Sequence, residues 1–190
     1  MSKDQIKLRS MIMIALFAAI IGVLAQITIP LPLVPITGQT LAIGLAATIL
    51  GARNGTLAVI LYLIIGIAGV PVFAEFGAGV SKLIGPTGGF LIGFIPQAFF
   101  MGLFMEKLGF TLKNALIANI VGMFITLFFG TAWLKISVDL SWTAAFASGF
   151  TPFIIVGIVK AVIASWVGIL VRKRLISSKL LITRNTNIAN

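Results

Sequence analysis

Residues 149–171 read GFTPFIIVGIVKAVIASWVGILV. Apart from Lys160, no side chain in this stretch is charged, and its length matches the roughly 20 residues that an α-helix needs to cross ~30 Å of hydrocarbon. The stretch therefore predicts a transmembrane helix. The whole composition agrees, because 59% of the 190 residues are apolar and 9% are charged, whereas soluble domains carry about 25% charged residues.

Five further apolar stretches complete an expected all-α integral membrane protein, a compact six-helix bundle that forms one domain over residues 1–190. The six expected helices cover residues 10–27, 36–51, 55–70, 88–105, 114–133 and 149–171. Residues 36–70 as one helix would measure ~52 Å. The sequence GARNG at residues 51–55 places a charge, an amide and two flexible residues at their centre, so we expect a turn there.

The basic residues predict the orientation of the chain. Eleven of the 14 fall on the side of both termini, whereas Lys82 and Lys135 fall on the opposite side and Lys160 lies within a span. Because cytoplasmic loops are enriched in Lys and Arg, we expect both termini in the cytoplasm and residues 172–190 to form a basic tail. The net charge of +10 then indicates topology and contact with anionic lipid, and no nucleic-acid partner. The eleven are Lys3, Lys7, Arg9, Arg53, Lys107, Lys113, Arg172, Lys173, Arg174, Lys179 and Arg184.

The first expected helix has a second interpretation. A basic start followed by an apolar stretch that ends in Val23-Leu24-Ala25 is also typical of a cleavable signal peptide. We expect the helix to be retained, because the apolar stretch is long for a signal peptide and the other helices would lose a packing neighbour.

The composition excludes several classes of chemistry. The chain has no Cys and no His, which removes disulfides, thiol redox, His or Cys metal sites, and Ser-His-Asp or Cys-His catalysis. Its four acidic residues lie outside the apolar runs or at their edges, so it has no paired intramembrane carboxylates. No Gly-Lys dipeptide occurs, and therefore no Walker A loop for nucleotide hydrolysis.

The outer loops have an unusual composition. The first reads PLPLVP at residues 30–35 and continues into TGQT at 37–40, and the second contains GVPVFAEFGAG at 69–79 and GPTGGF at 85–90. Loops this apolar and glycine-rich suit a lid that folds back over a pocket, because irregular backbone at membrane depth must be buried or line a cavity. A cap that only seals the bundle is the alternative interpretation.

Lys160 and Asn119 are two of the polar residues inside the expected spans. A lysine at the bilayer centre costs ~2.5–3.5 kcal/mol on insertion scales, so Lys160 should face the bundle interior. There it is satisfied either by backbone carbonyls or Glu75, or by a polar or anionic ligand, and we favour the ligand. Asn119 lies only ~8 Å into its span, where we expect an interhelical hydrogen bond. The pair Ala15 and Ala19 permits close helix approach, either inside the bundle or on a docking face.

Four quoted segments together resemble the BioY family, the biotin-specific substrate-binding (S) components of energy-coupling factor (ECF) transporters. These segments are VPITGQTL at 34–41, YLIIGIAGVPVFA at 62–74, GPTGGFLIGF at 85–94, and Pro152-Phe153 with Lys160. The resemblance implies six helices in a bacterial plasma membrane and a biotin site toward the extracellular side, with loop lids. It also implies assembly with a transmembrane scaffold protein and two ATPase subunits, with no catalytic residues, metal or cofactor.

Carried to this sequence, the resemblance implies a set of substrate-binding residues and a partner interface. The substrate-binding candidates are Thr37, Gln39, Phe73, Gly85, Thr87, Gly89, Phe90 and Lys160, and the scaffold interface is Ala15 with Ala19. One position departs from the pattern: the family's last helix typically carries Asp three residues before the lysine, where this chain has Gly157. An S component for thiamin or riboflavin, a self-sufficient secondary permease and an intramembrane enzyme remain alternatives.

Overall fold

Helices make up most of the computed structural model, which describes residues 3–181. Five helical segments are long and apolar enough to cross a membrane, namely α1, α2, α4, α5, and α6 together with α7. The elements in chain order are α1 (Lys3–Leu24), β1 (Thr28–Ile29), β2 (Ile36–Thr37), α2 (Gln39–Ile67), the 3-10 turn η1 (Ala74–Phe76), α3 (Ser81–Ile84), α4 (Gly88–Leu108), α5 (Leu112–Ser137), α6 (Trp142–Gly149) and α7 (Thr151–Ser177).

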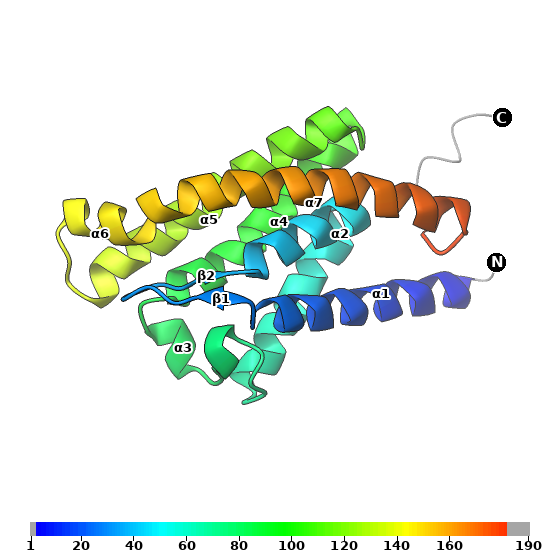
Figure 1. Cartoon of the computed structure of the whole chain (residues 1–190). Helices are drawn as coiled ribbons and strands as arrows, with labels where there is room; N and C mark the ends of the chain where they lie inside the picture. Colours follow the sequence, from blue (N-terminus) through cyan, green and yellow to red (C-terminus); the bar gives the residue numbers. More distant parts are fainter. Residues whose placement is uncertain (1–2, 182–190) are drawn as a thin grey trace.

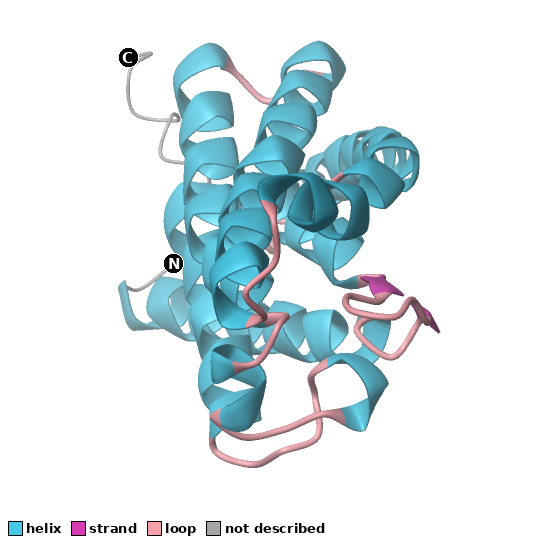
Figure 2. Ribbon diagram, turned by 90° about the vertical axis from the view of Figure 1, so that its left-hand side faces the viewer, coloured by secondary structure: helices cyan, strands magenta, loops and turns pink. Residues whose placement is uncertain are grey.

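The two ends of the helix bundle differ in character. The start of α1 and the end of α7 lie at one end (Figure 1), and we call it the terminal end. The β1–β2 ribbon, α3 and α6 lie at the other, which we call the loop end. Figure 2 views the molecule from the loop end, where the loops lie across the helices. The strands pair antiparallel, Thr28 opposite Thr37 and Ile29 opposite Ile36.

The predicted second and third spans are the two limbs of α2, which is broken at Gly51. Gly51 has φ 82° and ψ −171°, and the limbs run in different directions from it (Figure 1). The expected turn over residues 51–55 was therefore too long, because Ala52, Arg53 and Asn54 already belong to the second limb. One residue in the left-handed region suffices for the change of direction, and glycine adopts that region at little cost.

The break has polar partners for the backbone groups that it frees. The Ala52 N–H donates to Oε1 of Glu106 at 2.8 Å, so the carboxylate caps the start of the second limb. The Arg172 guanidinium of α7 donates to the Ile49 carbonyl at the end of the first limb. Side chains of α4 and α7 therefore replace the hydrogen bonds that a continuous helix would make.

The break predicts that replacing Gly51 by alanine destabilises the fold. A Cβ at this position would contact the Glu106 carboxylate. The alanine would also have to adopt a positive φ, at a cost of about 1–3 kcal/mol for the backbone alone. Gly109 is a matched control, because it has φ +94° but open space around its Cβ position. We expect Gly51→Ala to lower the thermal unfolding temperature in detergent more than Gly109→Ala does. Equal losses would show that the Glu106 contact adds nothing.

The ends of several helices lie further out than predicted. The helix α1 begins at Lys3 rather than residue 10, and α7 runs to Ser177, so residues 172–177 of the expected tail are helical. Residues 182–190, with Arg184, lie outside the described residues. Lys and Arg are good helix formers, which explains why the basic ends continue the helices where the apolar pattern stops. The span expected from residue 149 begins instead at Thr151, after a separate short helix, α6.

Asn119 joins three helices, which confirms the prediction of an interhelical hydrogen bond. Its Nδ2 donates to Thr48 Oγ1 of α2 and Ser165 Oγ of α7, both at 3.2 Å, and to Ala115 O of its own helix at 2.9 Å. All three side chains are buried. The amide and two hydroxyls satisfy one another within an apolar core, away from the loop-end site described below.

Helix α1 has one buried face and one exposed face. Ala18 and Ile21 are 3% and 0% exposed and belong to the core, whereas Ala15 and Ala19 are exposed. The apolar residues Ile12 and Leu16 are 56% and 50% exposed on the same outer side. In the part of the chain that the structure describes, the small pair is therefore not part of the buried core and belongs to an outer, apolar helix surface.

Candidate functional site

A cavity of about 460 Å³ opens at the loop end, between the first loop, the second outer loop and helices α2, α4, α5 and α7. Its volume lies within the range of about 300–1,000 Å³ that is usual for small-molecule sites. Seven of the eight residues predicted to bind a ligand line it. These are Thr37, Gln39, Phe73, Gly85, Thr87, Phe90 and Lys160.

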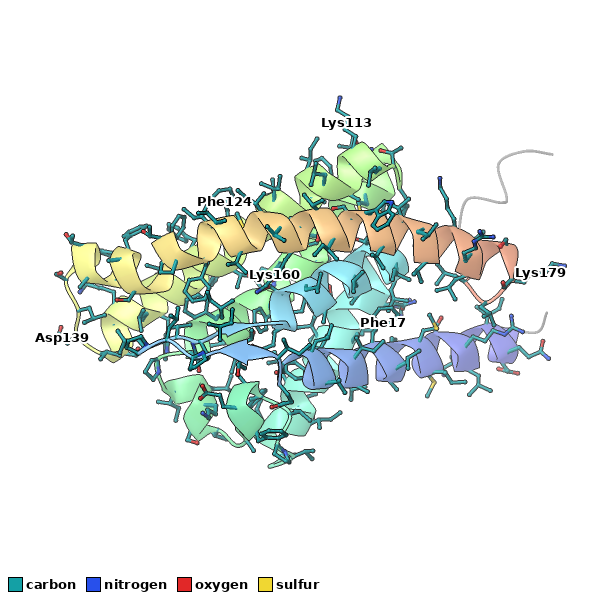
Figure 3. The ribbon with its side chains drawn as sticks, in the orientation of Figure 1. Phe17, Lys113, Phe124, Asp139, Lys160 and Lys179 are labelled. Carbon is teal, nitrogen blue, oxygen red and sulfur yellow. The ribbon has the colours of Figure 1, made fainter. Side chains whose placement is uncertain are left out.

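Lys160 points from α7 toward β2 and the start of α2 (Figure 3). Its Nζ donates to the Thr37 carbonyl at 2.6 Å and to Thr40 Oγ1 at 3.3 Å. Both acceptors are neutral, so neither cancels the ammonium charge. Glu75, the carboxylate expected as an alternative partner, lines the same cavity but is not a hydrogen-bond partner of Lys160. The lysine thus offers the cavity one positive charge inside an apolar protein.

Thr37 and Gln39 form a buried polar network with Tyr62. Thr37 Oγ1 donates to Gln39 Oε1 at 2.7 Å, and Gln39 Nε2 donates to Tyr62 Oη at 2.6 Å. The network fixes the Gln39 amide, whose oxygen already accepts a hydrogen bond and whose nitrogen retains a further N–H. Tyr62 was not among the predicted site residues. It is the only tyrosine in the chain, and a buried phenol usually has a hydrogen-bond partner.

Aromatic rings form the apolar wall of the cavity. The Phe90 and Phe153 rings lie 5.9 Å apart between centroids, and Phe73 meets Tyr62 edge-on at 5.5 Å. Phe73 is only 2% exposed, because its ring occupies the space that a side chain at Gly66 would fill. Phe73 therefore anchors the second outer loop into the core and also lines the cavity.

Gln26 fastens the second outer loop to the end of α1. Its Nε2 donates to Phe73 O at 3.1 Å and to Gly22 O at 3.0 Å, and its Oε1 accepts from the Phe76 N–H at 2.9 Å. Between these contacts, Glu75 and Phe76 both have positive φ, 58° and 54°. This conformation is costly for non-glycine residues, so the amide contacts hold the loop over the cavity.

We therefore expect Gln26→Leu to loosen this loop without unfolding the bundle. The change removes hydrogen bonds at both ends of the strained turn, each worth about 0.5–1.5 kcal/mol. Hydrogen–deuterium exchange should become about tenfold faster in residues 70–79. The neighbouring change Ile27→Leu is the control, since Ile27 is 63% exposed. Unchanged exchange in Gln26→Leu would mean that the core anchor alone fixes the loop.

Gly89, the eighth predicted binding residue, does not line the cavity. A Cβ there would contact Trp133 Cβ and lie 2.6 Å from the Phe129 carbonyl. Gly89 instead lets α4 approach α5. Trp133 also donates from Nε1 to the Gly85 carbonyl at 3.0 Å, which fixes the loop segment just before α4.

Position 157, where the chain departs from the family pattern, also lines the cavity. A Cβ at Gly157 would contact the Met123 sulfur and lie 3.0 Å from Met123 Cγ. The methionine, another lining residue, thus occupies the space beside the glycine. Thr126 lines the same region and donates to Gln97 Oε1 at 2.6 Å. Thr126 is a polar residue in the middle of an apolar span, and this position was a signal that it could line the cavity. The motif-based prediction did not use that signal.

The BioY family model matches residues 1–177. The chain belongs to the BioY family. Its relatives include biotin transporter BioY2 of Lactococcus lactis, 44% identical over 86% of this chain and 90% of that protein. Biotin transporter BioY of Thermotoga maritima is 39% identical over 87% of this chain and 97% of that protein.

An S-component of known crystal structure has the same fold as this chain. The crystal structure of the S-component for biotin from an ECF-type ABC transporter matches with a TM-score of 0.84 and 27% identity, covering 91% of this chain and 95% of that one. BioY proteins are transporter components and not enzymes. Family membership and the apolar helices identify this BioY chain as a multi-pass plasma-membrane protein.

Proposed function

We propose that this BioY chain binds biotin in the loop-end cavity and is the substrate-specific subunit of an ATP-driven ECF transporter. The observation that carries the proposal is the position of Lys160 in a largely apolar, aromatic cavity. Among the described residues 3–181, this cation is hydrogen-bonded only to neutral oxygens. A chain 44% identical to a biotin transporter makes biotin the first molecule to test in that cavity.

The chemistry of biotin suits the cavity. Its bicyclic body and aliphatic chain are apolar, and its polar groups are a ureido group and a carboxylate. Phe73 and Phe90 cover the apolar part, and Lys160 donates to an oxygen of one of the polar groups. Thr37 and Gln39 hold the remaining polar contacts, alongside backbone groups of the loop at Gly85 and Thr87. A few polar groups in an apolar site give orientation and specificity.

Transport requires partners in this proposal, because the 190 residues contain no Walker A motif. A transmembrane scaffold docks on the exposed face of α1 around Ala15 and Ala19, where the small side chains permit close helix approach. Two ATPase subunits bind that scaffold and supply the energy. The excess of basic residues then marks the terminal end as cytoplasmic, and the cavity opens toward the outside.

Two measurements on the full chain test this function. Calorimetric titration of the detergent-purified protein with biotin, thiamin and riboflavin should give saturable binding of biotin alone. Uptake of labelled biotin by proteoliposomes should need the scaffold, the ATPases and ATP. Binding of a different vitamin would show that biotin is not the ligand. Uptake by the chain alone would show that it is a self-sufficient permease.

A further inference from the structure

A second, smaller cavity lies at the terminal end, far along the helices from the biotin site. It has a volume of about 70 Å³ and lies between the start of α1, the broken part of α2 and the end of α7. Arg9, Ser10, Asn54 and Arg172 give it a polar lining, and none of its lining residues is acidic. Nothing in biotin binding or in scaffold docking through Ala15 uses these four side chains.

The two arginines are held in place from outside the cavity. Arg9 donates to the Lys179 carbonyl. Arg172 donates to the Ile49 carbonyl, and its Cζ lies 3.4 Å from the centroid of the Phe110 ring. Arg172 is only 7% exposed. Each guanidinium has five N–H donors in a planar fork, so both retain donors beyond these contacts. Glu106 attracts Arg172 electrostatically, and an anion between the two guanidinium groups offsets the repulsion that remains between their positive charges.

The size of the cavity favours one kind of anion. A water molecule needs about 10–15 Å³ of such space, so 70 Å³ holds roughly five atoms of oxygen size. A phosphate group has this size, and guanidinium groups bind it through paired hydrogen bonds. The serine hydroxyl and the asparagine amide add further donors. Glu106, which caps Ala52 beside the break, is not among the lining residues.

We propose that this cavity binds a phosphate-bearing anion, either the headgroup of an anionic phospholipid or free phosphate. Apolar side chains surround the polar lining. Ile6 and Leu180 are 38% and 47% exposed, and Met13, Leu50 and Leu181 complete the wall. A bound anion links α1, both sides of the α2 break and α7, so it also stabilises the end of the bundle.

The test compares lipids and variants of the full chain in detergent. Native mass spectrometry and thermal unfolding would follow added phosphatidylglycerol, phosphatidylcholine and inorganic phosphate. We expect phosphatidylglycerol to bind and raise the unfolding temperature more than phosphatidylcholine does. Arg9→Gln should weaken this binding about tenfold, the loss of one charge-assisted hydrogen bond, and leave biotin affinity unchanged. Asn54→Leu gives a second variant, because Arg172→Gln also removes the contact to Ile49.

The control is Arg53→Gln, which removes an exposed arginine beside the break that does not line this cavity. Protection of the native chain by millimolar inorganic phosphate, lost in Arg9→Gln, would assign the cavity to a free anion. Protection by phosphatidylglycerol alone would assign it to lipid. If Arg9→Gln and Asn54→Leu bind every probe as Arg53→Gln does, the side chains that line the cavity do not hold the anion and the proposed site is wrong.

Discussion

Replacing Lys160 by methionine weakens biotin binding by tenfold or more while the protein stays folded. Methionine keeps much of the length and the apolar stem of lysine but removes the charge. The loss follows from the value of a hydrogen bond to a charged group, about 1.5–3 kcal/mol, in a cavity where no carboxylate bonds to Lys160. The measurement is calorimetric titration of the purified variant with biotin.

The control for this result is Lys135→Met. Lys135 lies near the loop end of α5, where its Nζ is 5.8 Å from the centroid of the Trp142 ring, and it does not line the cavity. The variant loses the same charge, so it should bind biotin as the native chain does. Equal affinity in both variants would remove Lys160 from the site. A loss in both would show that the charge acts only through the overall electrostatic field.

The second large effect is expected on the exposed face of α1. Ala15→Trp places a large ring on the exposed face of α1 and should abolish assembly with the ECF scaffold. Helix pairs that meet through small residues need close backbone approach, which the ring prevents. Biotin binding by the isolated chain should be unchanged, because Ala15 is exposed and does not line the cavity. Co-purification with the scaffold measures the loss.

The matched control is the same substitution at Ala147, an exposed alanine of α6. Ala147→Trp adds an equal ring to the surface at the loop end, and it should assemble normally. If Ala15→Trp still co-purifies with the scaffold at the native level, the partner docks elsewhere on the bundle. If both variants fail to assemble, the effect is not specific to α1.

The positions of the spans could be predicted from the sequence because lipid imposes a simple rule on composition. The stretch around Lys160 and the two-part run over residues 36–70 both correspond to helices, and Asn119 joins three of them as expected. The break at Gly51 was harder to place. A turn and a one-residue break have the same local sequence, and Glu106, which caps the second limb, lies in a distant helix.

The kinds of residue around the cavity could be predicted from the sequence, but the role of each individual residue could not. Proline, glycine and aromatic residues in the outer loops indicated a lid, and Lys160 indicated a polar contact. Gly89 belongs to the same segment, residues 85–90, as neighbours that line the cavity. It packs against Trp133 instead, because the way in which α4 crosses α5 determines which glycine of α4 faces α5. Gln26 does not belong to any of the sequence motifs from which the site was predicted. Its role comes from the path of a loop that begins more than forty residues later.

The most direct test of biotin binding in the loop-end cavity is the structure of this chain with biotin bound. We predict biotin inside the loop-end cavity, with Phe73 and Phe90 against its apolar part and Lys160 Nζ within hydrogen-bond distance of one of its oxygens. Biotin bound outside this cavity, or bound inside it with Lys160 still directed only at Thr37 and Thr40, would contradict the central claim.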